Sequence, residues 1–229
     1  MREIWTPGLE EKIARKTHVT VHPGMMFSLA KDTMEKTKLW KIVRKMPKGA
    51  LLHAHCDAMV DFDYLFEVLL NTPGLHIWCE DSHLATAEAR ETASILVRFK
   101  QTPHTEGSLW QEDYVPGTPI LLTQAADDFP GGRPEFLKWL KSRCTISQTE
   151  AISQHHGVAH IWQKFQDCFI VIGTFIHYEP VFRAFLRRLM SKLYEDGISW
   201  VEIRYAQPLV LKALVVFVFC YYLEGEIIH

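Results

Sequence analysis

Two different periods of apolar residues divide the first third of the chain into expected helices and strands. Between residues 23 and 45, apolar side chains recur at roughly helical spacing among lysines, which predicts one amphipathic helix before a Pro-Lys-Gly turn. The next segment, residues 50–55, is short and apolar with histidines at alternate positions, which favours a buried strand. Residues 61–70 predict a helix with acidic residues at its start, and residues 75–79 predict a short strand.

The rest of the chain predicts mainly helices. The stretch 101–132 is rich in Pro, Gly, Thr and Asp, and we expect a long surface excursion there. Helical spacing and a glycine stop at Gly197 then predict three helices and a final strand, at residues 134–143, 157–172, 179–194 and 198–205. A strand, several helices and another strand form an α/β order, which fits a parallel sheet.

Composition supports a folded protein without a general affinity for nucleic acid. Hydrophobic residues make up 48% of the 229 residues, which is enough for a sizeable core and excludes disorder across the chain. The 25 basic and 27 acidic residues give a formal net charge of −2, so a broad electrostatic surface for nucleic acid is not expected.

The cysteines and the apolar runs indicate a cytoplasmic protein. The five cysteines are odd in number and contain no CxxC pair, so we expect reduced thiols in a reducing compartment. Residues 1–24 mix charges throughout and contain no apolar leader. The longest apolar run, residues 209–223 with Lys212 inside it, is shorter than the roughly 20 residues that a membrane-spanning helix needs. A membrane span is therefore not expected.

The sharpest chemical signal is the pair His53 and His55. On a strand, residues two apart point to the same face, so both imidazoles can reach one metal ion. Neutral imidazole is a good zinc ligand, but a catalytic zinc site takes three or more protein ligands. Two strand histidines hydrogen-bonded in a core are the alternative interpretation.

Three blocks of sequence, in one order, resemble the adenosine deaminase family. PKGALLHAHCDA at residues 47–58 resembles the opening strand of these enzymes, and most closely that of the adenosine deaminase growth factor branch and its fungal members. A second block consists of IWQKF at residues 161–165 and IHYEPVFR at residues 176–183, and the third is EDGISWVEIR at residues 195–204. The resemblance covers roughly residues 47–206 and corresponds to the N-terminal part of the family.

The resemblance implies a fold, a reaction and a set of site residues. The fold is a metal-dependent (β/α)8 barrel with a helical insertion after the first strand, and the reaction is the hydrolytic deamination of adenosine, or a close purine nucleoside, to inosine and ammonia. His53 and His55 would bind one Zn²⁺, and Asp57 would lie by the substrate ribose. Trp162, in the insertion, would line the pocket, although a tryptophan at this helical spacing also suits a core.

The chain departs from the family pattern after its second barrel strand. It contains no His-Ala-x-Glu motif, no later histidine on a convincing strand and no Asp-Asp pair at a late strand end, so no catalytic acid or base is assigned. A complete barrel typically takes about 250 residues, more than this chain has. We expect an N-terminal helical extension at 1–46, an incomplete barrel at 47–206, an atypical apolar tail at 207–229, and a truncated, inactive form.

Alternative functions stay open on the sequence alone. The chain is either a zinc-dependent deaminase by descent, a non-catalytic remnant or interaction fragment, or another metal-dependent hydrolase with an HxHxD opening. An incomplete sheet leaves edges and apolar faces exposed, which predicts a homo-oligomer. A nucleophilic pair of Cys56 and His55 is not expected, because adjacent strand residues face opposite sides. For Glu202 and Arg204 we expect a buried ion pair.

Overall fold

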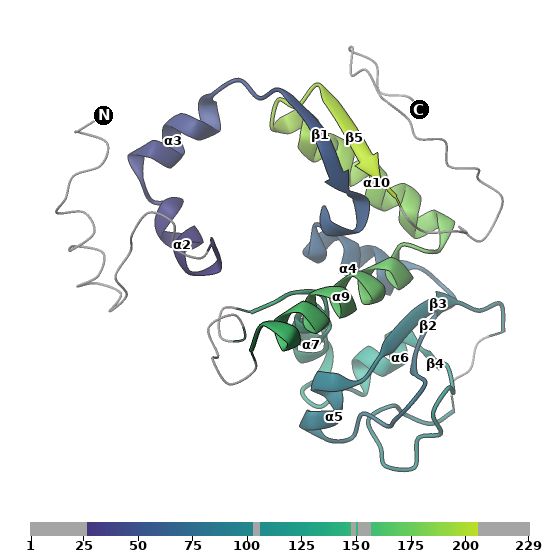
Figure 1. The fold of residues 1–229 in the computed structure, drawn as a ribbon. Coiled ribbons are helices and arrows are strands. Elements are labelled where there is room, and N and C mark those ends of the chain that lie inside the picture. Colours follow the sequence, from purple (N-terminus) through teal and green to yellow (C-terminus); the bar gives the residue numbers. More distant parts are fainter. Residues whose placement is uncertain (1–26, 103–105, 148–149, 151–156, 206–229) are drawn as a thin grey trace. The chain divides into compact units, whose positions relative to one another are not determined.

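A computed structural model describes residues 27–102, 106–147, 150 and 157–205 of the chain (Figure 1). The chain divides into two compact units, which are Met1–Lys48 with Ser147–Gly157, and Gly49–Ile146 with Val158–His229. The start of the helix expected from residue 23 and the apolar tail at 207–229 lie outside the described residues. No helix in the described ranges is long and apolar enough to cross a membrane.

Between residues 27 and 48, the first unit has two helices where the sequence predicted one. Helix α2 spans Phe27–Met34 and helix α3 spans Lys38–Lys45. Between them, Thr37 has an extended backbone and its hydroxyl accepts a hydrogen bond from the Trp40 backbone N–H at 3.0 Å. The expectation of one continuous helix was wrong because this side-chain cap starts a new helix, a local signal that apolar spacing does not contain.

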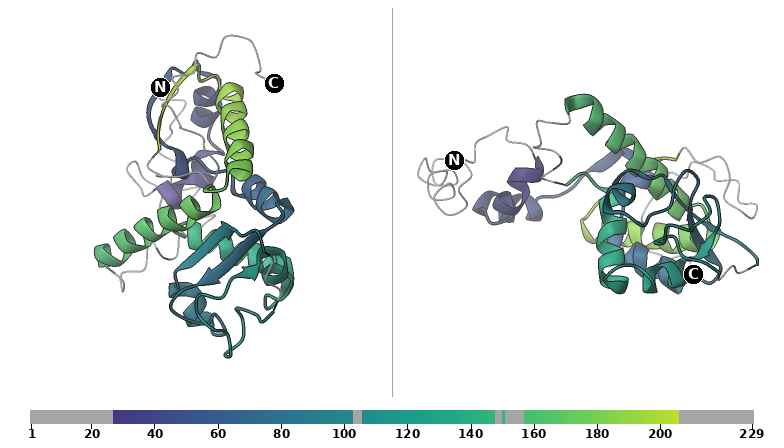
Figure 2. Two further views of the ribbon diagram at one scale, coloured as in Figure 1. Left: turned by 90° about the vertical axis from the view of Figure 1, so that its right-hand side faces the viewer. Right: turned by 90° about the horizontal axis from the view of Figure 1, so that it is seen from below.

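The second unit is organised around a parallel pair of strands, as the α/β order predicted. Strand β1 (Ala50–His55) pairs with β5 (Trp200–Arg204), although most of the unit separates them in sequence. Figures 1 and 2 show helix α10 (Glu179–Glu195) alongside this pair, and α10 also contacts α4 (Phe62–Asn71). The parallel arrangement is therefore confirmed, while the incomplete barrel and its helical insertion stay predictions.

The segment between β1 and β5, for which we predicted helices and a single short strand at 75–79, contains an antiparallel sheet. Its strand order is β3-β2-β4, with β2 at Leu75–Cys79, β3 at Ile95–Phe99 and β4 at Ile120–Leu121. Every residue of β2 is buried. Strand β2 was predicted from its apolar run, whereas β3 and β4 were not, because short strands carry a weak pattern.

The stretch 101–132 is not the plain surface excursion that its composition predicted. It contains β4 and helix α6 (Leu122–Asp127), and the Trp110 side chain is buried, with its indole N–H donating to the Ala125 carbonyl at 2.8 Å. The Pro- and Gly-rich composition correctly predicted that this stretch contains turns. The few large apolar side chains within the stretch decide its burial, since each of them removes much apolar area from water.

Three helices appear where helical spacing predicted them. They are α7 at Gly132–Cys144, α9 at Gly157–Phe175 and α10, and a further short helix, α5 at Ala87–Thr92, was not anticipated. Gly197 has a φ of 76°, a left-handed conformation that favours glycine, and it follows α10 as expected. The buried face of α10 repeats every four residues and packs into the core of the unit, at Val181, Phe185, Leu189 and Leu193.

Candidate functional site

The two histidines of β1 project together from one face of the β1–β5 sheet. Their Nε2 atoms lie 3.3 Å apart and their ring centroids 5.2 Å apart, and both side chains are exposed. The residues that alternate with them, Ala54 and Cys56, are buried on the opposite, helix-covered side. Strand geometry therefore converges the two imidazoles, as the His-x-His spacing predicted.

This separation suits two ligands of a single zinc ion. Zinc–imidazole bonds of about 2.0–2.1 Å in a tetrahedral shell place neighbouring nitrogens roughly 3.3–3.4 Å apart. The same distance also fits a long hydrogen bond between one protonated and one unprotonated ring nitrogen. Within the described ranges, no group of three or more His, Cys, Asp or Glu side chains comes together to hold a metal. These residues thus supply two donors, one fewer than a catalytic zinc site requires.

Asp57 lies at the end of β1, in a single 3₁₀ turn at Cys56–Ala58. Its side chain is half-buried, and burial raises the pKa of its carboxyl, while its own backbone amide and the charge of His55 act in the opposite direction. The carboxyl is therefore within electrostatic reach of His55. Asp57 thus follows His55 by two residues at the end of β1, and its expected contact with a ribose stays a prediction.

Cys56 takes no part in this face. Its side chain is 1% exposed and points into the core, and burial, followed by the charge of Asp57, raises the pKa of its thiol to about 12. A thiol in this state is protonated at neutral pH and is a poor nucleophile. The expectation that Cys56 and His55 do not form a nucleophilic pair agrees with this geometry.

Strand β5 contributes an ion pair to the same face. The parallel register sets Arg204 beside His55, and the Arg204 guanidinium lies 3.3 Å from the Glu202 carboxylate. Arg204 Nη2 also donates to the Leu52 carbonyl at 3.4 Å. The side chains of Arg204 and Glu202 are 42% and 33% exposed, so the expectation of a buried ion pair was wrong. Both residues lie on the open face of the sheet, and the helices cover the other face.

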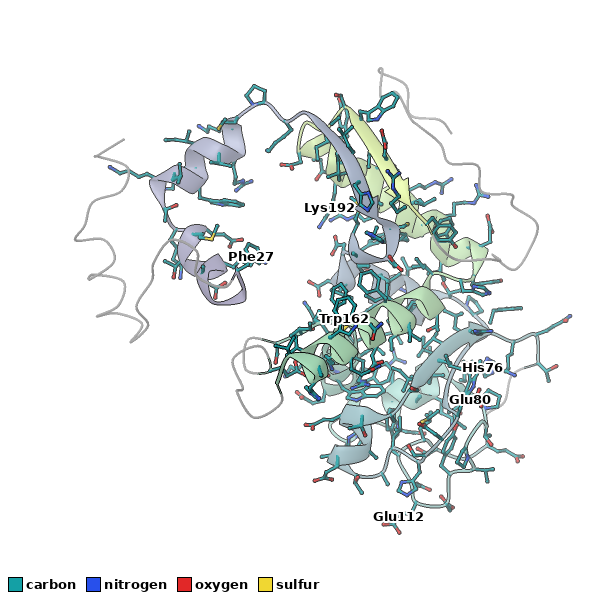
Figure 3. All side chains as sticks on the ribbon, in the orientation of Figure 1. Phe27, His76, Glu80, Glu112, Trp162 and Lys192 are labelled. Atoms are coloured by element: carbon teal, nitrogen blue, oxygen red, sulfur yellow. The ribbon has the colours of Figure 1, made fainter. Side chains whose placement is uncertain are left out.

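A row of aromatic rings on α9 leads from the histidines to solvent. The Phe169 ring meets His55 edge-on at 6.2 Å, Phe165 meets Phe169 at 4.9 Å, and Trp162 stacks on Phe165 at 5.4 Å. Trp162, labelled on α9 in Figure 3, is 59% exposed. It therefore lies at the outer, exposed end of the row, outside the core.

Phe169 is the neighbour that sequence reasoning missed. Its signal was present, because residues 162, 165 and 169 share one helical face. The pattern does not say which surface that face meets, and the structure shows that its inner end meets His55. Asp127 and Asp128, at the end of α6, are both exposed, and Asp127 pairs with Arg133.

Comparison with known proteins gives relatives that share one name. No family model matches the chain. It is 30% identical to "Adenosine deaminase 2" of Homo sapiens over 190 residues, which cover 80% of this chain and 32% of that protein. It is 27% identical to "Adenosine deaminase" of Phlebotomus duboscqi over 189 residues, which cover 81% of this chain and 32% of that protein. It is 23% identical to "Adenosine deaminase 2" of Dictyostelium discoideum over 183 residues, which cover 79% of this chain and 30% of that protein.

The chain spans about a third of the length of the curated relatives it matches. The growth factor branch and the fungal type within the family stay predictions. The names of these relatives, which align with most of this chain, point to the same family as the motif at His53 and His55. The matches support the relationship of this chain to the adenosine deaminase family that its sequence motifs indicate.

Proposed function

We propose that this chain represents the N-terminal part of a zinc-dependent hydrolase that deaminates adenosine or a close purine nucleoside. The observation that carries the proposal is the pair of Nε2 atoms 3.3 Å apart on the open face of β1. The relatives named adenosine deaminase support the same reaction class. The near-neutral charge argues against an alternative hydrolase that acts on nucleic acid.

His53, His55, Asp57 and Trp162 each have a chemical role in this proposal. His53 and His55, as neutral imidazoles, would hold the Zn²⁺, and the metal would supply the activation of water for attack at neutral pH. Asp57, half-buried beside His55, accepts a hydrogen bond from a ribose hydroxyl. Trp162 offers an exposed indole face on which a purine base can stack.

The donor count supports a second, non-catalytic candidate. The described residues supply two imidazoles and no third metal ligand in reach of them. We propose that the 229 residues alone bind zinc weakly and do not turn over nucleoside. In that case they serve as an interaction fragment, for which the exposed aromatic row on α9 provides apolar surface.

Metal binding is tested by titrating the purified chain with Zn²⁺ in a calorimeter. We expect one weak site per chain, and a loss of affinity of tenfold or more in His53→Ala and in His55→Ala, because each removes one of two ligands. His160→Ala is the matched control, since His160 is an exposed histidine on α9. Wild-type affinity in both His53→Ala and His55→Ala would rule out the pair as the metal site.

Turnover is tested separately by measuring ammonia release from adenosine at saturating Zn²⁺. We expect no release above a zinc-only blank. Release that disappears in His53→Ala would overturn the inactivity of the chain while supporting the deaminase chemistry. Zinc binding without release is the result that the two-donor geometry predicts.

A further inference from the structure

Helix α3 of the first unit carries an exposed stripe of apolar side chains. Leu39, Ile42 and Val43 are spaced three and four residues apart along the helix, so they share one of its faces. They are 44%, 48% and 39% exposed, and Met46, which directly follows the helix, is 54% exposed. No residue of α3 is buried. This apolar stripe is therefore accessible to a partner.

Basic side chains border the apolar stripe. Lys38 lies one turn before Ile42 and Lys45 one turn after it, and both lysines are exposed. Residues 36–56 contain six basic residues and no Asp or Glu, although the net charge of the whole chain is −2. These six residues form the basic cluster, which consists of Lys36, Lys38, Lys41, Arg44, Lys45 and Lys48. The four that lie on α3 form no ion pair with any other residue that the structure describes.

We propose that α3 and the basic cluster bind the surface of a membrane that contains anionic phospholipids. An amphipathic helix of this kind lies in the plane of the interface, with its apolar side chains at the boundary of the acyl chains. The lysine stems run along the apolar surface while their ammonium groups stay at the level of the phosphates. Clusters of four to eight basic residues on an amphipathic helix are typical of anionic lipid recognition. The eight residues of α3 lie on the membrane and do not span it.

The composition of the basic cluster favours a lipid surface over an acidic groove in another protein. Five of its six residues are lysines. Lysine is depleted at protein–protein interfaces, where arginine is enriched. A lysine ammonium on its flexible stem acts as a mobile point charge, which suits an array of phosphates with no fixed positions. The apolar stripe is small, so binding depends on the charge of the lipid. This inference is independent of the proposed deaminase reaction.

The test is cosedimentation of the purified chain with vesicles. One set consists of phosphatidylcholine alone, and the other contains about 30% phosphatidylserine, each at about 50 mM and about 500 mM NaCl. We expect the chain to sediment with the phosphatidylserine vesicles at low salt, to stay in the supernatant with phosphatidylcholine, and to be released at high salt. The salt dependence follows from screening of the basic cluster.

A double variant tests the charges beside the apolar stripe. Each basic residue near an anionic surface increases partitioning roughly fivefold, so Lys38→Gln with Lys45→Gln lowers the partition coefficient about thirtyfold. Arg98→Gln with Arg187→Gln is the matched control, because it removes the same charge from two exposed residues of the second unit. We expect the control to bind as the wild type does.

A second variant tests the apolar stripe itself. Ile42→Ser removes an exposed aliphatic side chain from α3, and we expect a fall in partitioning of about tenfold. Val158→Ser, the same kind of change at an exposed residue of α9, retains wild-type binding. Circular dichroism melts show that each variant is folded.

Three results would overturn the proposal. The first is equal sedimentation with both kinds of vesicle, or with neither of them. The second is binding of the wild type to soluble polyglutamate but not to vesicles, which would assign the basic cluster to an acidic protein. The third is a dimer in size-exclusion chromatography that Ile42→Ser dissociates, without vesicle binding, which would assign the apolar stripe to a second copy of the chain.

Discussion

The two sheets of the second unit differ in what covers them. Strand β2 is buried at every residue and is paired on both edges, with β3 and with β4. Strand β1 buries Ala54 on its helix-covered side and exposes Leu52, His53 and His55. The β3-β2-β4 sheet is therefore a packed core element, whereas the β1–β5 sheet presents polar ring nitrogens to solvent.

This difference separates stability from chemistry. A strand that is buried on both faces contributes mainly through apolar area removed from water. A strand with one open face holds side chains whose donors and acceptors face solvent or a ligand, so its exposed residues are available for binding. The two kinds of strand should therefore respond very differently to the same kind of substitution.

The largest expected effect is on the buried sheet. Ile77 on β2 is fully buried and pairs with Val97 and Ile120, so Ile77→Ala leaves a cavity and lowers the free energy of unfolding by about 4 kcal/mol. Leu52→Ala on β1 is the matched control, because Leu52 is 59% exposed, and we expect a change within about 0.5 kcal/mol. Urea denaturation measures both, and equal losses would remove the contrast between the sheets.

A smaller loss of stability is expected at Arg143, which donates to backbone carbonyls just before β3. Arg143 on α7 is buried, and its guanidinium donates to the Glu91 carbonyl and, at 3.1 Å, to the Ala93 carbonyl at the end of α5. Arg143→Ala leaves the buried Ala93 carbonyl without its donor and lowers the free energy of unfolding by about 2–3 kcal/mol. Thermal melting followed by circular dichroism checks this value. A wild-type melting temperature in Arg143→Ala would show that the guanidinium does not support β3.

The smallest effect is expected beneath the β1–β5 sheet. Asp61 directly precedes α4, and its carboxylate accepts hydrogen bonds from two side chains of α10, Lys192 at 2.8 Å and Arg188 at 3.0 Å. These two partners hold the pKa of the Asp61 carboxyl below its usual range. Because the folded-state pKa is depressed, this stabilisation is present above the unfolded pKa of about 3.9 and is lost as the pH falls through the folded value.

The Asp61→Asn variant isolates this contribution. Both cations are more than a third exposed, so we expect a loss below about 1 kcal/mol at pH 7. The difference between wild type and variant should shrink as the pH falls below 4. Urea denaturation between pH 3 and pH 7 measures it, with Asp63→Asn as the control at the exposed carboxylate two residues away. A difference that does not change with pH would contradict the ion pairs.

The pattern of apolar and polar residues predicted the elements that depend mainly on contacts between residues close together in the sequence. The helical repeat of α10 and the alternation of His53 and His55 are visible in the sequence, because the backbone alone sets periods of 3.6 and 2. The break at Thr37 and the strands β3 and β4 were missed, since a hydroxyl cap or a partner strand outweighs apolar spacing there.

The sequence by itself determined that two imidazoles share one strand face and that a long helix follows Pro180. Only the tertiary structure decided that β5 pairs with β1, that the Phe169 ring meets His55, and that Lys164 on α9 donates to the Ser142 carbonyl on α7. These contacts join residues far apart in the chain. Their free energy comes from burial and packing among several elements, and no single stretch of sequence contains that information.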